Sequence, residues 1–310
     1  MAARILNGNA IRDQIYGELA GEIAALAAVG IRPGLAAVLV GDNPASKVYV
    51  KSKIAACEKL GLASIQVTPP ATISTAELLT IVEDLNRRDD VDGILVQLPL
   101  PPQVDAKKIL DAVDPAKDVD GFHPCNVGNL VTGRSGPKSC TPAGIIRLLH
   151  HYRIPIAGRH AVVVGRSDIV GKPMAMLLLH ENATVTICHS KTQDLAGICR
   201  QGDILVAALG RPAALTADFI KPGATVIDVG TNRIVDRSEA ARIFRNSKDK
   251  LDAFDRRGNV TVGDLDPVDV AEKASAYSPV PGGVGLLTIA MLMLNTVELA
   301  ERRLGGLHAQ

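Results

Sequence analysis

Residues 161–173, with the sequence AVVVGRSDIVGKP, constrain the fold of this chain more than any other stretch. A short apolar run leads to Gly165 and a polar turn, and Gly171 precedes an apolar-periodic run. This pattern is typical of a buried strand, a tight turn and a helix start. Phosphates bind at such turns in α/β proteins, because free N–H groups point out of the helix N-terminus. No glycine stands between Gly165 and Gly171, so the usual dinucleotide fingerprint is absent and an ordinary strand-to-helix turn remains the alternative.

Strand-like and helical patterns alternate on both sides of this stretch. Apolar runs that predict buried strands lie at residues 35–40, 64–67 and 93–97, and again at 160–164, 184–188, 204–207, 225–229 and 260–265. Helical patterns separate most of them, and one at residues 74–88 begins with a capping box of Ser74 and Glu77. We therefore predict an α/β protein with two α/β domains around a cleft, the second a Rossmann-like doubly wound parallel sheet.

A long segment at residues 114–142, rich in Pro, Gly and Asn, separates the two alternating regions. It is predicted to be irregular, and irregular segments of this length are usually functional. The charged run at 236–259 is predicted to be a solvated helix or excursion without chemistry. An amphipathic helix at 286–304 follows a stiff loop and is expected to return to the first domain. The predicted domains are residues 1–142 plus 286–310, and residues 143–285.

Composition excludes several classes of function. A chain of 310 residues with net charge +1 and no dense Lys/Arg block is not expected to bind nucleic acid, and 3% aromatic residues without Trp provide few stacking platforms. We expect no membrane association, because no apolar run approaches the ~20 residues of a bilayer span and the N-terminus lacks a signal-peptide core. Five scattered cysteines without a CxxC pair indicate reduced thiols and a cytoplasmic protein, and no metal motif is present.

Two groups of residues in the first half could support chemistry. Tyr49 and Lys53 are four apart in a helical pattern, so an aromatic ring and an amine project from one face and could bind a flat heterocycle. The alternative is a half-packed tyrosine beside a solvated lysine. Gln97 ends a buried strand, at the edge where α/β sheets bind ligands, and a lone glutamine there needs hydrogen-bond partners.

Three further stretches are candidates. Asp118 and Asp120 flank a valine in the irregular segment, where turn-forming or capping roles are the alternative. The loop PVPGGVG at residues 279–285 combines stiff prolines with glycines that allow close ligand approach. The strand at 184–188 ends in His189-Ser190-Lys191 without the acid that NAD sites usually place there. Together with Arg166, these residues suit a 2′-phosphate and predict a preference for NADP.

Taken together, the chain resembles the bifunctional methylenetetrahydrofolate dehydrogenase/methenyltetrahydrofolate cyclohydrolase family. The matching stretches occur in the family's order over nearly the whole chain: YVKSK, VQLPLP, KDVDGFHPCNVG, CTPAG, VVVGRSDIVGKP, ATVTICHSKT, GDILVAALG, VIDVGTNR and PVPGGVG. The resemblance implies a cytoplasmic homodimer of one-carbon metabolism, supplying purine biosynthesis. It implies a folate-binding catalytic domain, tetrahydrofolate one-carbon derivatives as substrates, and NADP in the second domain.

The resemblance also implies roles for individual residues. Lys53 matches the catalytic lysine, Gln97 the glutamine that hydrogen-bonds it, and Asp120 the acid that holds the pterin nitrogens. The substrate set implied by the family is Tyr49, Lys53, Gln97, Leu98, Asp120, Pro281, Gly282 and Gly283. The cofactor set is Gly165, Arg166, Ser167, Ser190 and Thr231.

The expected chemistry follows from these matches. A hydride would pass from 5,10-methylenetetrahydrofolate to NADP⁺, which depends mainly on positioning, and Lys53 would move protons when water adds to the methenyl product. The chain departs from the family at Leu286-Leu287, where Pro-Met is usual, at Thr231, and in the longer 236–259 excursion. Another NADP-dependent dehydrogenase on this architecture, or a non-catalytic relative, is the alternative.

Overall fold

The structure is a computed structural model that describes residues 3–245 and 247–308, and it divides into two compact units. The six-stranded unit comprises Met1–Arg12 and Thr141–Thr288, and the three-stranded unit comprises Asp13–Cys140 and Ile289–Gln310. Three helices run from one unit into the other along the chain: α1 (Gly8–Ala28), α6 (Cys140–His151) and α12 (Val284–His308). Each unit is an α/β layer structure, as the alternating patterns predict.

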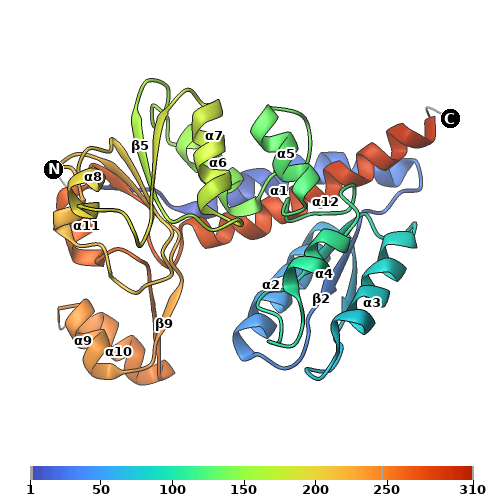
Figure 1. Ribbon diagram of the computed structural model, residues 1–310, viewed down its shortest axis with the longest axis horizontal. Helices are drawn as coiled ribbons and strands as arrows, with labels where there is room; N and C mark the ends of the chain where they lie inside the picture. The colour runs from blue at the N-terminus through green and yellow to red at the C-terminus, as the bar shows by residue number, and fades with distance from the viewer. Residues whose placement is uncertain (1–2, 246, 309–310) are drawn as a thin grey trace. The chain divides into compact units, whose positions relative to one another are not determined.

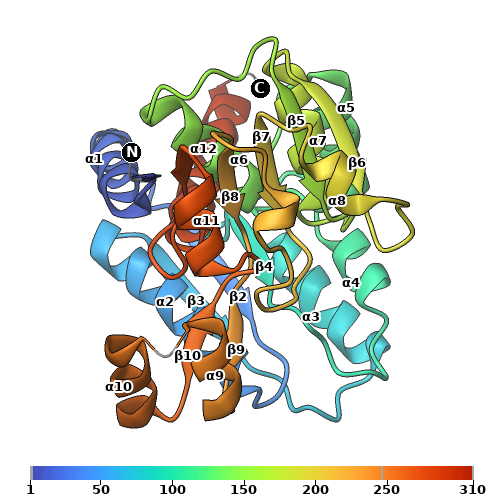
Figure 2. The ribbon, with the colours of Figure 1, turned by 90° about the vertical axis from the view of Figure 1, so that its left-hand side faces the viewer.

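The six-stranded unit is built on a fully parallel sheet with the strand order β1-β11-β8-β7-β5-β6. Its strands are β1 (Arg4–Ile5), β5 (His160–Val164), β6 (Thr184–Cys188), β7 (Ile204–Ala207), β8 (Thr225–Asp228) and β11 (Ala276–Tyr277). The chain order reverses between β5 and β7, which is the switch point of a doubly wound sheet. Helices α7 (Gly171–His180), α8 (Leu195–Cys199) and α11 (Pro267–Lys273), with the 3₁₀ turn Ala217–Phe219, connect the strands (Figure 2).

The first residues of the chain pack with this sheet and not with the domain predicted for them. Strand β1 pairs in parallel with β11, so that Arg4 lies opposite Ala276 and Ile5 opposite Tyr277. Both strands are two residues long, which is too short for a periodic pattern to reveal. Arg4 and Ile5 therefore pair with the six-stranded sheet, although the predicted first domain includes them.

The charged run at 236–259 folds into a small subdomain. Strands β9 (Asn232–Ile234) and β10 (Val260–Val262) form an antiparallel ribbon, and helices α9 (Arg237–Ile243) and α10 (Lys248–Arg257) lie between them in sequence. The buried side chains of Ile234, Phe244 and Phe254 make a core of their own. The expected strand at 260–265 is thus shorter than predicted and belongs to this ribbon. Figures 1 and 2 both show the subdomain projecting away from β5 and β7.

The three-stranded unit is a parallel sheet with the order β3-β2-β4. Its strands are β2 (Gly34–Val38), β3 (Ala63–Val67) and β4 (Gly93–Val96). One helix follows each of the first two strands and two helices follow the third: α2 (Pro44–Leu60), α3 (Thr75–Arg87), α4 (Ala106–Ala112) and α5 (Pro124–Thr132). Strands β2 and β4 are buried at every position, as continuous apolar runs predict. Helix α3 begins with the predicted capping box, in which Ser74 and Glu77 bond each other's backbone N–H groups.

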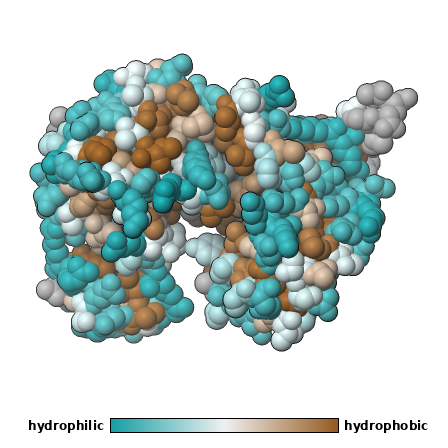
Figure 3. Space-filling model, in the orientation of Figure 1, coloured by the Kyte–Doolittle hydropathy of each residue, from teal (hydrophilic) through white to brown (hydrophobic). Residues whose placement is uncertain are grey.

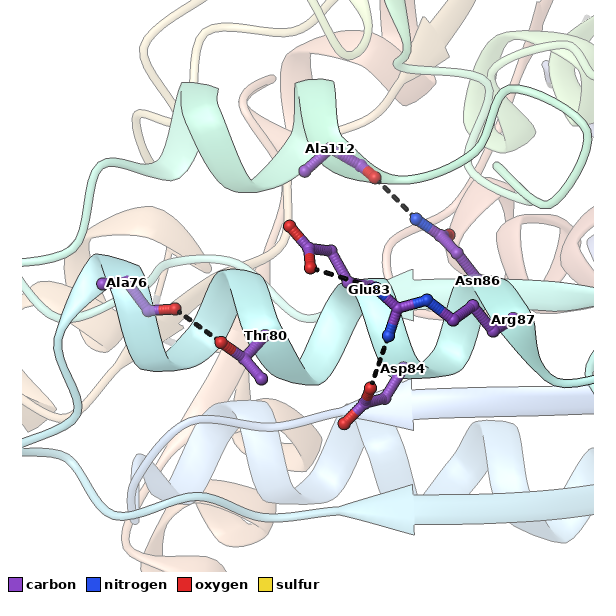
Figure 4. A network of polar contacts seen from close by, with 7 residues as sticks. All are labelled: Ala76, Thr80, Glu83, Asp84, Asn86, Arg87 and Ala112. Atoms are coloured by element: carbon purple, nitrogen blue, oxygen red, sulfur yellow. Dashed lines mark hydrogen bonds and ion pairs between the residues drawn. The ribbon is translucent and has the colours of Figure 1, made fainter.

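Helices α3 and α4 are joined by a polar network on the surface of this unit (Figure 4). The Asn86 amide donates to the Ala112 carbonyl at 2.8 Å and accepts from the Asp114 N–H at 2.9 Å. This side chain of α3 therefore binds the C-terminal end of α4. Arg87 pairs with Glu83 and Asp84 on the exposed side of α3. Exposed pairs of this kind contribute ~0.2–1 kcal/mol each, so the Asn86 link does more to fix the two helices.

The segment at 114–142 is more regular than predicted. Helix α5 lies within it, with Pro124 in its first turn and Gly133, in the left-handed region at φ 70°, ending it. Before α5 the backbone forms a parallel bridge between Asp118 and Ile94, which extends the small sheet. The segment therefore runs along β4 and carries its acidic residues to the end of that sheet.

Helix α12 is the longest helix among residues 3–245 and 247–308, and Val284–Gly305 is also the one stretch there with the length and apolar composition of a membrane span. The expectation that no apolar run approaches that length is therefore wrong for this helix. Because 61% of the stretch is buried inside the protein, its pattern is that of a core helix. In the orientation of Figure 1, the surface in Figure 3 is mainly hydrophilic, and smaller groups of hydrophobic residues lie among the hydrophilic ones.

Candidate functional site

In the three-stranded unit, the structure brings Lys53 and Gln97 into direct contact. Lys53 projects from α2 and is buried, at 9% exposure, and its Nζ donates to Gln97 Oε1 at 3.0 Å. Gln97 lies directly after β4, and its own amide donates to the Leu98 carbonyl at 2.8 Å, which fixes the side chain orientation. A buried amine held by a neutral acceptor keeps its remaining protons available to a bound molecule. The residues alone predict only that Gln97 needs hydrogen-bond partners, and the family resemblance implies that Lys53 is one of them.

Tyr49 lies one helical turn before Lys53 and is not a core residue. Its side chain is 44% exposed, although α2 also buries Val50 and Cys57. An exposed ring beside a buried amine leaves the aromatic face open to a flat ligand. The alternative of a half-packed tyrosine beside a solvated lysine is therefore wrong for Lys53, which is buried. The Tyr49 ring remains accessible.

Asp120 is the third group of this site. It is half-buried, and burial raises the pKa of its carboxyl to about 7, while the Lys53 ammonium opposes that rise and Asp118 adds to it. Among the described residues, no hydrogen-bond donor reaches the Asp120 carboxylate. A carboxylate in this position can accept hydrogen bonds from N–H groups of a ligand.

Asp118 has a different role from Asp120. It is buried, and its carboxylate accepts from the His123 N–H at 2.8 Å and from the Asn126 amide at 2.9 Å. These bonds tie the start of α5 to the bridge with β4. The turn-forming alternative that the sequence leaves open for both acids thus holds for Asp118.

In the six-stranded unit, the predicted cofactor residues follow the carboxyl ends of neighbouring strands. Gly165, Arg166 and Ser167 follow β5, Ser190 follows β6, and Thr231 follows β8. Because β5, β6, β7 and β8 are parallel, these residues share one edge of the sheet at its switch point. The side chains of Arg166, Ser190 and Thr231 are exposed there.

The turn after β5 requires glycine. Gly165 has φ +143°, and a Cβ at this position would lie 2.3 Å from the Ala208 carbonyl oxygen. A Cβ on Gly171 would lie 2.2 Å from the Gly165 carbonyl oxygen, so both glycines let the turn pack against the sheet. Ser167 Oγ accepts from the N–H groups of Val170 and Gly171, at 3.2 Å each, and shapes the start of α7. The turn is therefore a tight backbone cradle at a helix N-terminus.

The end of β6 carries no acid. His189 and Ser190 follow the strand, and the His189 backbone N–H donates to Thr192 Oγ1 at 2.8 Å, closing a turn that leaves Ser190 and Lys191 exposed. Arg166 is exposed on the neighbouring turn. A tight turn at a helix N-terminus, flanked by cationic and hydroxyl groups, fits a phosphorylated dinucleotide of the NADP type.

The glycine loop at 281–283 belongs to the six-stranded unit. The Gly282 carbonyl accepts from the Gly8 N–H at 2.8 Å, and Gly283 is buried against the start of α1. Pro281 follows a cis peptide bond and is exposed. The loop is thus anchored at its glycines and accessible at Pro281.

Sequence reasoning missed three buried polar residues near these positions. Asp264 is fully buried and accepts from three successive backbone N–H groups at 209–211, directly after β7. Asp228 accepts from the N–H groups of Gly230, Asp264 and Leu265, and burial raises its pKa to about 7. Asn295, on α12, donates to the carbonyls of Val119 and Lys138. A polar residue inside an otherwise apolar run was the available signal for Asp228 and Asn295.

Two other features lie outside the predicted sites. A cavity of about 450 Å³, lined by Asp92, Lys117 and Arg303 among others, includes residues before β4, whereas Gln97 follows that strand. Among residues 3–245 and 247–308, no group of three or more His, Cys, Asp or Glu side chains could hold a metal ion. All five cysteines are free thiols, and four of them are buried.

The fold and site define a two-unit α/β enzyme, with a Rossmann-like sheet for NAD(P) in the six-stranded unit and a lysine-centred site in the three-stranded unit. Two family models match the chain in the same order. Residues 6–120 match the catalytic domain of tetrahydrofolate dehydrogenase/cyclohydrolase, and residues 139–304 match its NAD(P)-binding domain. The chain belongs to the tetrahydrofolate dehydrogenase/cyclohydrolase family.

Individual relatives agree with this assignment. A bifunctional protein FolD from Solibacter usitatus is 69% identical over 97% of this chain and 99% of its own length. The crystal structure of the bifunctional enzyme from Campylobacter jejuni has a TM-score of 0.88 at 44% identity, over 97% of this chain and all of that one. The Trypanosoma brucei enzyme, solved with NADP and an inhibitor, has a TM-score of 0.88 at 36% identity, over 98% and 99% of the two chains.

Proposed function

We propose that this chain oxidises 5,10-methylenetetrahydrofolate to 5,10-methenyltetrahydrofolate with NADP⁺ and hydrolyses that product to 10-formyltetrahydrofolate. The observation that carries the proposal is the buried Lys53–Gln97 pair, whose residues lie within the region that matches the family's catalytic domain. The S. usitatus relative, matched over nearly the whole chain, is named as a bifunctional protein, which supports both activities.

In the dehydrogenase reaction the protein mainly positions its ligands. Bound NADP⁺ supplies the acceptor for the hydride that leaves the methylene carbon. Gly165 and Ser167 would hold the phosphates of this cofactor, and Arg166 and Ser190 would bind its 2′-phosphate. Because the methenyl product is a cation stabilised by its own nitrogens, this step needs little proton transfer, and correct orientation provides most of the acceleration.

In the cyclohydrolase reaction Lys53 moves the proton. Water adds to the methenyl carbon and loses one proton. The bond from that carbon to the ring nitrogen then breaks as the formyl C=O forms, and the hydroxyl proton is transferred to the nitrogen. The Lys53 amine, held at 3.0 Å by Gln97 Oε1, is the group that we assign to these proton transfers. Gln97 orients the amine through a neutral acceptor.

The remaining residues of the site bind the folate. Tyr49 stacks on the pterin ring, and the Asp120 carboxylate accepts hydrogen bonds from the pterin amino group and ring N–H. In the three-stranded unit Leu98 is assigned to the folate as well. The loop at Pro281, Gly282 and Gly283 of the six-stranded unit is assigned to substrate binding on the family resemblance. With these assignments the domain of residues 1–142 and 286–310 binds folate, and residues 143–285 bind NADP. Arg4 and Ile5, which pair with β11, are the exception in the folate-binding domain.

We also propose that the enzyme is a cytoplasmic homodimer whose formyl product serves purine biosynthesis. Strand β6 lies at one end of the described six-stranded sheet. Ile187 in this strand is 38% exposed, and Leu179 in the neighbouring helix α7 is 53% exposed. An edge strand flanked by exposed apolar side chains favours a contact with a second copy. Free thiols throughout are typical of a reducing compartment.

The proposal is tested by following the methenyl intermediate in an assay with methylenetetrahydrofolate and each nicotinamide cofactor. We expect NADP⁺-dependent turnover and formation of 10-formyltetrahydrofolate. The variant Lys53→Met should lower the rate of hydrolysis of the methenyl compound by about 10²-fold or more, while dehydrogenase activity remains measurable. Equal loss of both activities in a folded Lys53→Met protein would assign Lys53 to binding, and absence of folate-dependent turnover in the native protein would refute the function.

A further inference from the structure

Asn295 is an unexpected residue in the apolar helix α12. Its side chain is buried at 3% exposure, in a helix that also buries Met293 and Val297. Its Nδ2 donates to the Val119 carbonyl oxygen at 2.7 Å and to the Lys138 carbonyl oxygen at 3.0 Å. One amide group therefore joins two backbone segments that are 19 residues apart in sequence, next to Asp120.

The two segments are packed tightly where the amide joins them. A Cβ on Gly121, which has φ +68°, would lie 2.7 Å from the carbonyl carbon of Lys138 and from the N atom of Ser139. The Cys140 thiol also reaches the Val119 carbonyl, at 3.4 Å. The backbone on both sides of Asp120 is therefore fixed through the 138–140 segment and α12.

The Asp120 side chain has no such support of its own. No donor among the described residues reaches its carboxylate, so the position of the carboxylate depends on the backbone that carries it. Asp118, by contrast, is held by its own hydrogen bonds. Loss of the backbone restraint would therefore affect Asp120 first.

We propose that Asn295 is a positioning residue that places the Asp120 carboxylate for folate binding, by clamping the Val119 and Lys138 carbonyls. The inference rests on the proposed function, because it takes Asp120 as the group that binds the pterin. Asn295 itself contacts neither substrate nor cofactor in this scheme. It acts by removing the freedom of the 119–121 backbone before the ligand arrives, which lowers the ordering cost of binding.

The expected effect is confined to folate. In Asn295→Ala the Lys138 carbonyl loses the Asn295 donor and the Val119 carbonyl keeps only the Cys140 thiol, so the segment rearranges and the carboxylate spreads over several positions. We expect the KM for methylenetetrahydrofolate and for methenyltetrahydrofolate to rise about tenfold, with kcat changed less and the KM for NADP⁺ unchanged, since binding of the pterin is what the clamp supports. Thr296→Val is the matched control: it removes a buried hydroxyl from the same helix that bonds only its own backbone, to the Leu292 carbonyl.

A double-mutant cycle separates positioning from a general loss of stability. If Asn295 acts through Asp120, Asn295→Ala should raise the folate KM in the native background but add no further rise to Asp120→Ala. The variant Asn295→Ser, whose hydroxyl can still donate one hydrogen bond, should have a folate KM between those of the native protein and Asn295→Ala. It replaces Asn295→Ala in the cycle if that variant does not fold. Calorimetric Tm values of all variants, with Thr296→Val alongside, establish that the proteins compared are folded.

The outcomes distinguish the inference from the function beneath it. An unchanged folate KM in Asp120→Ala would refute the role of Asp120 and with it the clamp. A raised KM in Asp120→Ala together with a native KM in folded Asn295→Ala or Asn295→Ser would overturn the clamp alone. So would a rise of the same factor in both backgrounds, because Asn295 would then act independently of Asp120.

Discussion

Replacing Asp120 by asparagine should change how the stability of the protein depends on pH. Burial raises the pKa of this carboxyl from 3.8 to about 7, against the attraction of Lys53. The folded state therefore keeps a proton that the unfolded chain releases near pH 4. Stability from this group is fully present below pH 4, is lost as the pH rises to about 7, and stays constant above.

The size of the effect follows from the pKa change. A rise from 3.8 to about 7 corresponds to at most about 4 kcal/mol of lost unfolding free energy, at about 1.4 kcal/mol per pH unit. Between pH 5 and pH 8 the native protein should lose about 3 kcal/mol of this, whereas Asp120→Asn, which remains neutral, should not. The variant should therefore become more stable relative to the native protein as the pH rises.

Urea unfolding at pH 5, 6, 7 and 8 measures this difference, and Asp89→Asn, which removes an exposed carboxyl of the same unit, controls for the loss of one charge. The same titration should appear in substrate binding. The ionised carboxylate accepts the pterin N–H groups, so the folate KM should fall as the pH rises through about 7 in the native enzyme only. A stability difference between Asp120→Asn and the native protein that is constant from pH 5 to pH 8 would refute the reasoning.

Three further predictions concern the turn after β5 and one helix start. Gly165→Ala places a Cβ 2.3 Å from the Ala208 carbonyl oxygen at φ +143°, so urea unfolding should show a loss of about 1–3 kcal/mol and the NADP⁺ KM should rise; a native value of both would contradict the cradle. Arg166→Ala should raise the KM for NADP⁺ at least tenfold and that for NAD⁺ much less, as steady-state kinetics would show; equal rises would argue against 2′-phosphate binding. Ser74→Ala removes the α3 capping box and should cost about 1 kcal/mol in urea unfolding with native kinetics, whereas a loss of activity would contradict a purely structural role.

Several strands could be predicted because they are buried on both faces. Residues 160–164 and 204–207 match β5 and β7, since a continuous apolar run between turns has few alternatives in a parallel sheet. The capping box at Ser74 was readable for a similar reason, because both of its bonds are local in sequence. Features fixed by local chemistry or by uniform burial are visible in a single sequence.

The parts that the sequence did not predict depend on distant partners. Strands β1 and β11 pair across almost the entire chain and are too short to carry a pattern of their own. Helix α5 lies in a segment rich in Gly, Asn and Pro, yet its Pro124 is at a position where proline favours a helix start. The run at 236–259 is charged, but Phe244 and Phe254 supply a core that its average composition hides.

The site shows the same division. The i, i+4 spacing of Tyr49 and Lys53 identified one helix face, and the strand end identified Gln97, but the spacing of Asp118 and Asp120 could not tell which acid is structural. That distinction depends on His123 and Asn126, whose donors reach one carboxylate and not the other. Hydrogen-bond partners, which a sequence does not display, therefore decide which acid remains available to a ligand.

Asp120 and Asp228 show why available partners matter more than a raised pKa. Burial raises the pKa of both carboxyls to about 7, so by titration alone both would be candidates for chemistry. Asp228, however, already accepts three backbone N–H groups and joins β8 to residues 264–265, which leaves it little to offer a ligand. Asp120 bears the cost of burial without any such donor, and a ligand that brings two N–H groups offsets that cost on binding. Above pH 7 the folded protein thus holds an unfavourable charge at Asp120. In the proposed folate-binding role a pterin would relieve it, and this difference in free energy would be available for substrate recognition.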